Sequence, residues 1–205
     1  MRFALVRPAR LFLSLTLIAV GPTACGDAAS PSAATPKTGE ADAKTPNPAE
    51  PAKEAPMEQK VLAEGDAAPK VEMTLQDGTK VALGDQKGLV FVYFYPKDDT
   101  PGCTVEAKGL RDNYADLQER GVKVFGVSMQ DAASHQAFIE KHELPFGLVV
   151  DDGSVARAFD VPVQGEFAAR HSFLIKDGKV VKVWRRVSPA EHAQEVLAAA
   201  DANRA

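Results

Sequence analysis

The residues best suited to chemistry lie in one short segment, Tyr95 to Thr104 (YPKDDTPGCT). Its nucleophile is Cys103, and a cysteine reacts as the thiolate. The segment follows an uninterrupted apolar run, Leu89 to Tyr95, and precedes a stretch with helical spacing at 104–119. Cys103 therefore stands at the start of a predicted helix, where unpaired N–H groups and the helix dipole stabilise an anion. An inert, buried cysteine in a turn is the alternative interpretation.

The elements that must position Cys103 alternate between strand and helix. Leu89 to Tyr95 has the apolar, β-branched and aromatic composition of a strand that is covered on both faces. The spacing then predicts a helix over 104–119, a strand over 122–127, a helix capped by Asp131, a strand over 147–150 and a helical turn over 154–159. This rhythm is typical of parallel strands joined by crossover helices, and sites gather at the carboxyl ends of such strands.

Two hairpins and a last helix complete the predicted domain, residues 61–205. The first hairpin joins 71–75 to 80–83 through Asp77-Gly78, and the second joins 172–175 to 180–184 through Asp177-Gly178. Ser188-Pro189-Ala190-Glu191 reads as a capping box that opens a helix. The inner face of that helix is predicted to be Ala193, Val196, Leu197 and Ala200. Together these elements predict an α/β fold, a three-layer α/β/α sandwich with an N-terminal β-hairpin extension.

The segment around Cys103 resembles a known family. Pro96, Thr100 and Cys103 reproduce the Pro-x-x-x-Thr-x-x-Cys motif of peroxiredoxins, and the run FYPKDDTPGCT is similar to the bacterioferritin comigratory protein (peroxiredoxin Q) branch. The likeness extends over residues 61–200 and includes Arg170, which precedes the strand at 172–175. The resemblance implies a thioredoxin-like fold and a thiol-dependent peroxidase that reduces hydrogen peroxide, organic hydroperoxides or both. It implies neither a cofactor nor a metal.

The resemblance also implies a role for each residue of the motif. Cys103 would be the peroxidatic nucleophile, whose thiolate attacks a peroxide oxygen and becomes a sulfenic acid. Arg170 would stabilise the thiolate and the charge that develops on the leaving oxygen. The hydroxyl of Thr100 and the backbone amides of Gly102 and Cys103 would hold the peroxide, and Pro96 would shield the sulfur from water.

Two further assignments keep an alternative. Glu106 lies one helical turn beyond Cys103, so it could orient Arg170 or a backbone group. It could equally be an acidic residue that the dipole favours in a first helical turn. Arg170 could be an ordinary surface arginine on a strand.

The chain departs from many peroxiredoxin Q proteins at Lys108, where they carry a resolving cysteine five residues after the peroxidatic one. Residues 61–205 contain no cysteine besides Cys103, so an internal disulfide cannot form. The resemblance therefore implies an external thiol reductant, either a thioredoxin-like protein or a small thiol, and a monomer or weak dimer. One rival, a thioredoxin-fold thiol–disulfide oxidoreductase, would need Cys-x-x-Cys. Another, a copper-delivering or non-catalytic binding lipoprotein, would need a second soft ligand.

Four histidines are present, and none is assigned a catalytic role: His135, His142, His171 and His192. His135 and His142 lie on one face of a predicted helix, but seven residues span about 10 Å along a helix, too far for one metal ion. We expect these two to be partly exposed residues at the edge of the core. His171 is expected to point away from Arg170, because side chains alternate along a strand.

The first 24 residues have the layout of a secretory signal, with three arginines, a short apolar run and then small residues. Cys25 follows, where bacterial lipoprotein signals place the lipidated cysteine, although Pro22 stands where such signals usually carry leucine. The alternative is ordinary signal cleavage nearby, which leaves Cys25 lost or idle. Residues 25–60, rich in alanine and proline, predict a disordered tether. We therefore expect an exported protein of the cell envelope or periplasm, bound to a membrane only by its lipid.

The charge balance excludes other classes of function. The formal net charge is −4, and removal of the signal segment with its three arginines lowers it to −7. A protein that grips a nucleic-acid backbone needs a basic face, so we expect no nucleic-acid partner. Two cysteines are also too few for a disulfide scaffold or a zinc ribbon.

Overall fold

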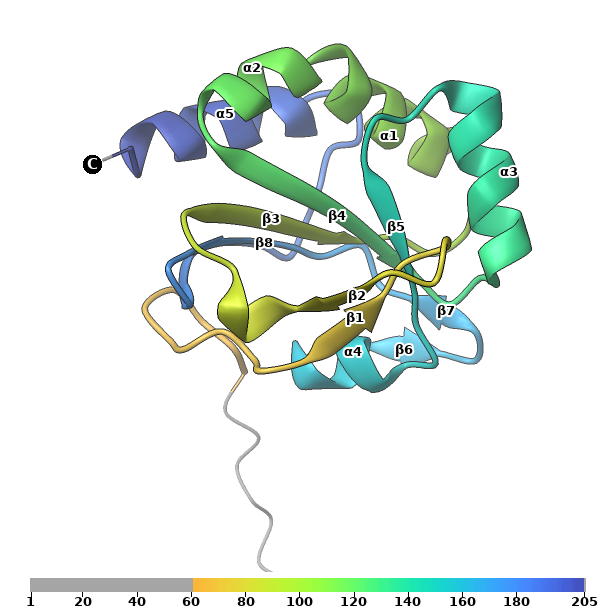
Figure 1. Cartoon of the computed structure of the whole chain (residues 1–205), viewed down its shortest axis with the longest axis horizontal. Helices are drawn as coiled ribbons and strands as arrows, with labels where there is room; N and C mark the ends of the chain where they lie inside the picture. Colours follow the sequence, from red (N-terminus) through yellow and green to blue (C-terminus); the bar gives the residue numbers. More distant parts are fainter. Residues whose placement is uncertain (1–60, 205) are drawn as a thin grey trace, which may run out of the picture. The chain divides into compact units, whose positions relative to one another are not determined.

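The computed structural model describes residues 61–204 of the chain (Figure 1). The predicted signal segment at 1–24, the lipidation candidate Cys25 and the predicted tether at 25–60 lie outside the described residues. Among residues 61–204, no helix combines the length and the apolar character that crossing a bilayer requires.

A five-stranded sheet forms the centre of the domain, in the order β5-β4-β3-β8-β9. β3 pairs in parallel with β4, and β4 with β5, whereas β8 runs antiparallel to β3 and to β9. β3 is the middle strand, and all of its residues are buried, as the apolar run predicts. The strands are β3 (Leu89–Phe94), β4 (Val122–Ser128), β5 (Gly147–Val150), β8 (Ser172–Lys176) and β9 (Lys179–Trp184).

The alternation of side chains along β3 divides the core in two. Leu89, Phe91 and Tyr93 point into a cluster that contains residues of the long helices. The intervening side chains of β3 point into a second cluster, which lies on the opposite face and includes Met73 and Phe159. Both faces of the strand are therefore covered, which is why its sequence carries no charged residue.

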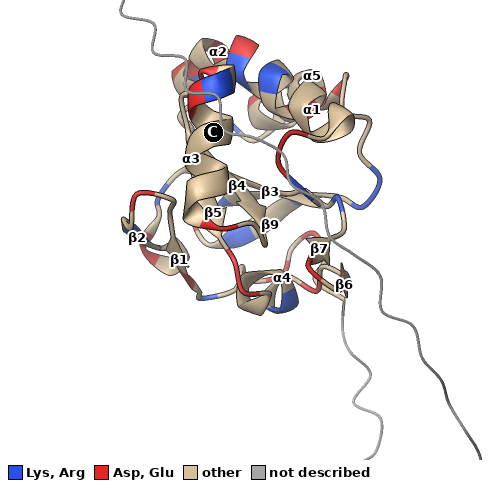
Figure 2. Cartoon of the chain, turned by 90° about the vertical axis from the view of Figure 1, so that its right-hand side faces the viewer, with Lys and Arg blue, Asp and Glu red and all other residues tan. Residues whose placement is uncertain are grey.

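One face of the sheet carries four helices (Figure 1). The crossovers from β3 to β4 and from β4 to β5 step in one direction and share a hand, which places their helices on the same face. The four helices are α1 (Pro101–Asp112), α2 (Tyr114–Glu119), α3 (Ala132–His142) and α5 (His192–Ala202). The other face carries α4 (Ser154–Ala158) and a hairpin of β1 (Glu72–Thr74) and β2 (Lys80–Ala82), which leads into the 3-10 turn η1 (Leu83–Asp85). Figure 2 shows α4 and a small hairpin of β6 (Val163–Gln164) and β7 (Phe167–Ala168) across the sheet from α1 and α5. The predicted three-layer sandwich with its N-terminal hairpin is confirmed.

The helix predicted over 104–119 has different bounds. α1 begins at Pro101, three residues earlier, because Thr100 adopts an extended conformation that can precede a helix and proline suits the first turn. The helical stretch is interrupted at Asn113 (φ −105°, ψ 11°). The side-chain amide of Asn113 donates to the carbonyl of Gly109 at 2.8 Å, and asparagine often competes with helical bonding in this way.

The two predicted helix caps have different outcomes. Asp131 caps α3 as predicted, since its carboxylate accepts a hydrogen bond from the Ser134 N–H at 2.8 Å. The capping box at Ser188 does not form. Instead, the N–H groups of Glu191 and His192 both donate to the Ser188 carbonyl in a turn, and α5 begins only at His192. The predicted inner face of α5 is buried nonetheless, because its spacing is unchanged.

Candidate active site

The loop between β3 and α1 is anchored by a buried carboxylate. Asp98 accepts hydrogen bonds from the Tyr95 hydroxyl at 2.8 Å, from the Ser134 hydroxyl at 2.6 Å and from His135 Nδ1 at 2.9 Å. Burial opposes the charge of Asp98, but the bonds from His135 and Ser134 outweigh it and lower the pKa of the carboxyl. The loop that carries the motif is thus tied to α3.

The next residue, Asp99, makes a second tie to the same helix. Its backbone lies in the left-handed region (φ 57°), and its carboxylate accepts hydrogen bonds from Lys141 Nζ at 2.9 Å and His142 Nε2 at 2.8 Å. The expectation that His135 and His142 are partly exposed edge residues is wrong for His135, which is fully buried. Both histidines bind a neighbouring aspartate of the loop. The signal that could have found them is the pairing of two consecutive acids with two histidines on one helix face.

Cys103 is the third residue of α1, and only 1% of its surface is exposed. The Thr104 N–H donates to the Thr100 carbonyl at 2.9 Å, the first bond of the helix. The N–H groups of Gly102 and Cys103 precede that bond, so the helix offers them no carbonyl acceptor. Such free amides at a helix start favour an anion beside them. Within residues 61–204, Cys103 is the only cysteine, and it is a free thiol.

Arg170 reaches this sulfur from the segment before β8. One guanidinium nitrogen, Nη2, lies 3.0 Å from Cys103 Sγ, and the other, Nη1, donates to the carboxylate of Glu106. The arginine side chain is 19% exposed, so it is not the ordinary surface arginine of the alternative interpretation. Gly102 leaves room for it, since a Cβ at Gly102 would lie 3.4 Å from Arg170 Nη2.

Glu106 is buried beneath Arg170, with 1% of its surface exposed. Burial raises the pKa of its carboxyl to about 7, although the charge and the hydrogen bonds of Arg170 act in the opposite direction. Of the two interpretations of Glu106, the structure favours contact with Arg170. An acid that merely complemented the dipole would stay in solvent.

The other two motif residues, Pro96 and Thr100, belong to the loop that precedes α1. The hydroxyl of Thr100 donates to the Lys97 carbonyl at 3.2 Å, within the loop. Pro96 is half-buried at the start of that loop. Their predicted roles in holding the peroxide and shielding the sulfur stay predictions. Among residues 61–204, no group of three or more histidine, cysteine or acidic side chains could hold a metal ion.

Comparison with known proteins shows the family to which the chain belongs. The sequence model of the AhpC/TSA family matches residues 64–183, more than half of the chain. Peroxiredoxin Bcp of Bacillus subtilis is 42% identical over 143 residues, which are 65% of this chain and 91% of the relative. The chain belongs to the AhpC/TSA family of peroxiredoxins. It is therefore a thiol-dependent peroxidase.

Solved structures confirm the thioredoxin-like peroxiredoxin fold. The bacterioferritin comigratory protein of Xanthomonas campestris, solved as trapped intermediate and ligand complexes to study its alkyl peroxide reduction activity, is 35% identical. It matches with a TM-score of 0.64 over 71% of this chain and 99% of its own. Peroxidoxin BcpB of Mycobacterium tuberculosis is 31% identical and matches with a TM-score of 0.65 over 70% and 99%.

The structure of this peroxiredoxin also locates the two remaining histidines. His171 is partly buried, and burial, followed by the charge of Arg185, lowers the pKa of its imidazole. His192, to which sequence reasoning gave no role, is completely buried, with Nε2 3.9 Å from Glu106 Oε1. No local pattern marks His192, because its partners lie on other elements.

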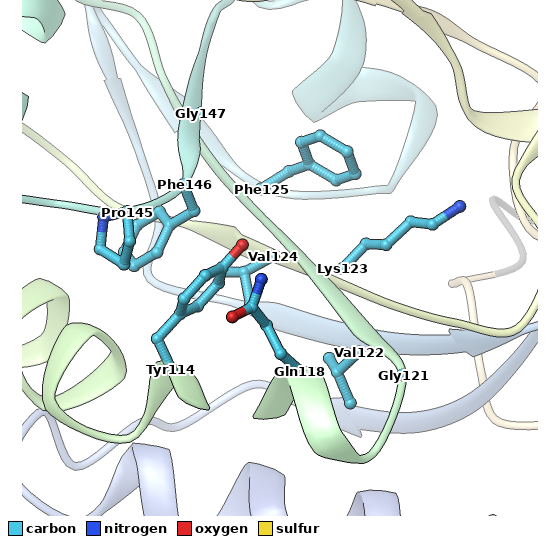
Figure 3. A pocket seen from close by; sticks show the side chains of 10 residues that line it. All are labelled: Tyr114, Gln118, Gly121, Val122, Lys123, Val124, Phe125, Pro145, Phe146 and Gly147. Atoms are coloured by element: carbon cyan, nitrogen blue, oxygen red, sulfur yellow. The ribbon is translucent and has the colours of Figure 1, made fainter. Parts of the chain in front are cut away.

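The domain also contains a cavity of about 450 Å³, whose lining residues Figure 3 shows. It opens between α2, the beginning of β4 and the segment before β5, and its lining includes Tyr114, Gln118, Lys123 and Phe146. Cys103 and Arg170 do not line it. The cavity is therefore separate from the cluster of Cys103, Glu106 and Arg170.

The buried position of Glu106 predicts a pH-dependent stability difference. The pKa of its carboxyl is about 7 in the folded protein, against about 4.3 in an unfolded chain. Between these values the folded state binds more protons, so this group stabilises the fold at low pH and loses that contribution as pH rises. Relative to wild type, Glu106→Gln should therefore gain on the order of 2–3 kcal/mol in unfolding free energy from pH 4.5 to 8. Urea unfolding at several pH values measures this gain, and a constant difference would contradict it.

Proposed function

We propose that this peroxiredoxin reduces hydrogen peroxide, organic hydroperoxides or both by a one-cysteine mechanism centred on Cys103. The observation that carries the proposal is the 3.0 Å contact between Arg170 Nη2 and Cys103 Sγ at the first turn of α1. The guanidinium and the backbone amides of the first helical turn place positive charge beside the sulfur before the peroxide arrives. They also stand ready to stabilise the charge that appears as the O–O bond breaks.

The reaction proceeds in two stages. The Cys103 thiolate attacks one peroxide oxygen, an S–O bond forms, the O–O bond breaks, and the second oxygen leaves and takes a proton to become water or alcohol. The product is a sulfenic acid. An external thiol then attacks the sulfenic sulfur, releasing water and forming a mixed disulfide, and a second thiol regenerates Cys103.

The need for an external thiol follows from the cysteine count. Cys103 is the only cysteine in residues 61–205, and the position five residues later is Lys108, whose side chain is exposed on α1. We propose a thioredoxin-like protein or a small thiol as reductant, and a monomer or weak dimer as the working form. Without that thiol, the sulfenic acid remains open to irreversible oxidation.

This mechanism predicts a trappable intermediate. In purified protein carrying Cys25→Ser, one equivalent of peroxide should give a species labelled at Cys103 by a sulfenic-acid probe. Excess peroxide without a thiol should then add a second oxygen and inactivate the enzyme progressively, because no thiol on the chain protects the sulfenic acid. Intact mass spectrometry follows both steps. A rapid, quantitative Cys103–Cys103 dimer would show that the chain resolves its own intermediate and that the one-cysteine mechanism is wrong.

We further propose that the protein is exported to the bacterial cell envelope or periplasm and is anchored by lipid on Cys25. The proposal rests on the sequence before and after this residue, with a basic segment, a short apolar run and small residues before it and a proline-rich stretch after it.

The anchor is tested by labelling a bacterial host that expresses the full chain with a fatty-acid analogue. We expect label on the wild type and none on Cys25→Ala, since the acyl chain needs the cysteine. A mature wild-type protein that begins at another residue and partitions into the aqueous phase would refute the anchor.

A further inference from the structure

His192 is a buried polar residue close to the carboxylate of Glu106. His192 opens α5 with a side chain that is completely buried. Its Nε2 lies 3.0 Å from the Ser172 hydroxyl on β8 and 3.9 Å from Glu106 Oε1 on α1. Its ring packs against Phe91 and Trp184, with centroids 5.4 Å and 5.3 Å away. An apolar side chain could make the same ring contacts, so the polar contacts of His192 need a separate explanation.

Glu106 provides this explanation, because only one of its two carboxylate oxygens has a hydrogen-bond partner among residues 61–204. Arg170 binds Oε2, whereas Oε1 is buried and has no hydrogen-bond partner within the described part of the chain. A buried acceptor without a partner costs free energy comparable to a lost hydrogen bond. His192 Nε2 faces this oxygen, and a movement of about 1 Å would bring the two atoms into hydrogen-bond distance.

A neutral imidazole can form a hydrogen bond with Glu106 Oε1 whether the Glu106 carboxyl is ionised or protonated. It carries one N–H and one acceptor nitrogen, and the two tautomers exchange these roles. With the proton on Nε2, His192 donates to an ionised Glu106. With the proton on Nδ1, which lies 3.5 Å from Glu195 Oε2, Nε2 accepts from a protonated Glu106. The Ser172 hydroxyl lies 3.0 Å from the same Nε2. In the first case the Nε2–H is shared between Ser172 and Glu106, and in the second Glu106 takes the Nε2 lone pair in place of Ser172.

We propose that His192 is a positioning residue of the peroxidase site, which satisfies the second oxygen of Glu106 in either protonation state and so keeps Glu106 and Arg170 aligned on Cys103. The inference rests on the proposed roles of Cys103 and Arg170. It places His192 outside the reacting atoms, since it acts on them only through Glu106 and Arg170.

The other groups around Glu106 are consistent with this role. Arg170 faces it from the segment before β8, Cys103 lies one turn earlier on α1, and the buried Tyr93 hydroxyl interacts with its charge from β3. Burial, followed by the charge of Arg170, lowers the pKa of His192 to about 4, so the imidazole is neutral at neutral pH. Of the pair, Glu106 is the group that changes its protonation near pH 7.

The test follows the titration of Glu106 in reduced protein, by carbon NMR of labelled glutamate carboxyls, with Glu106→Gln to assign the signal. His192→Phe keeps an aromatic ring but removes both the donor and the acceptor. A hydrogen bond to an ionised carboxylate is stronger than one to a neutral carboxyl, so the ionised form of Glu106 loses more and its titration midpoint should rise by about one unit. The pH profile of the rate constant with peroxide should shift in the same direction. His192→Gln restores a donor and an acceptor. In this variant the titration midpoint of Glu106 and the pH profile of the rate constant should both be close to those of the wild type.

Val196→Ala is the matched control, because Val196 is buried one turn further along α5 and has no polar group. Val196→Ala should lower the free energy of unfolding without changing the titration midpoint of Glu106. A wild-type midpoint in folded His192→Phe, or an equal shift in Val196→Ala, would overturn the positioning role. If phenylalanine prevents folding, His192→Leu should give the same shift. The midpoint is measured without turnover, so it does not depend on whether Cys103 proves to be the nucleophile.

Discussion

Replacement of Cys103 by serine is expected to abolish peroxide turnover while the protein stays folded. A serine hydroxyl is close in size to a thiol, so it fits the buried position at the start of α1. It does not ionise at neutral pH, and it therefore cannot attack the peroxide oxygen as a thiolate does. The rate of peroxide consumption with an excess of thiol reductant measures the loss, and circular dichroism checks the fold.

The matched control is Cys25→Ser, which removes the other cysteine of the chain and lies outside the described domain. Its turnover in solution should equal that of the wild type. If Cys103→Ser kept its activity, the assignment of the nucleophile would fail. If only Cys25→Ser lost activity, the chemistry would belong to the N-terminal cysteine instead.

Replacement of Arg170 by glutamine is expected to lower the rate constant with peroxide by about 10²–10³-fold, the usual cost of removing a donor that stabilises developing charge. The guanidinium of Arg170 contacts both Cys103 Sγ and the Glu106 carboxylate. Without it, Glu106 loses its charge partner, so the pKa of its carboxyl should rise above 7. Stopped-flow measurement of Cys103 oxidation gives the rate.

Arg186→Gln is the control for the loss of one positive charge. Arg186 is exposed after β9, and its side chain takes no part in the contacts around Cys103. Its rate constant should stay near the wild-type value. Equal losses in both variants would mean that Arg170 acts through the general charge of the surface rather than through its contact with the sulfur.

The sequence alone predicted those features of the protein that depend on residues close together in the chain. The apolar run at 89–94 forms the middle strand, and Asp131 caps its helix. Both hairpins turn at the predicted Asp-Gly pairs. Alternation, capping and turn formation depend on residues a few positions apart, so they can be read along the chain. The motif around Cys103 also consists of residues close together in the chain, and it predicted the peroxidase function.

The tertiary structure alone decided which side chains meet at the site. Glu106 and Arg170 are 64 residues apart in sequence, and His192 is a further 22 residues along. Asp98, in the loop before α1, is hydrogen-bonded to His135 on α3. These partners are chosen by how α1, α3, α5 and β8 pack on the sheet, and a buried carboxylate accepts whichever donor that packing presents. Local spacing therefore left Glu106 with two interpretations and His192 with none, because burial and its cost exist only in the folded chain.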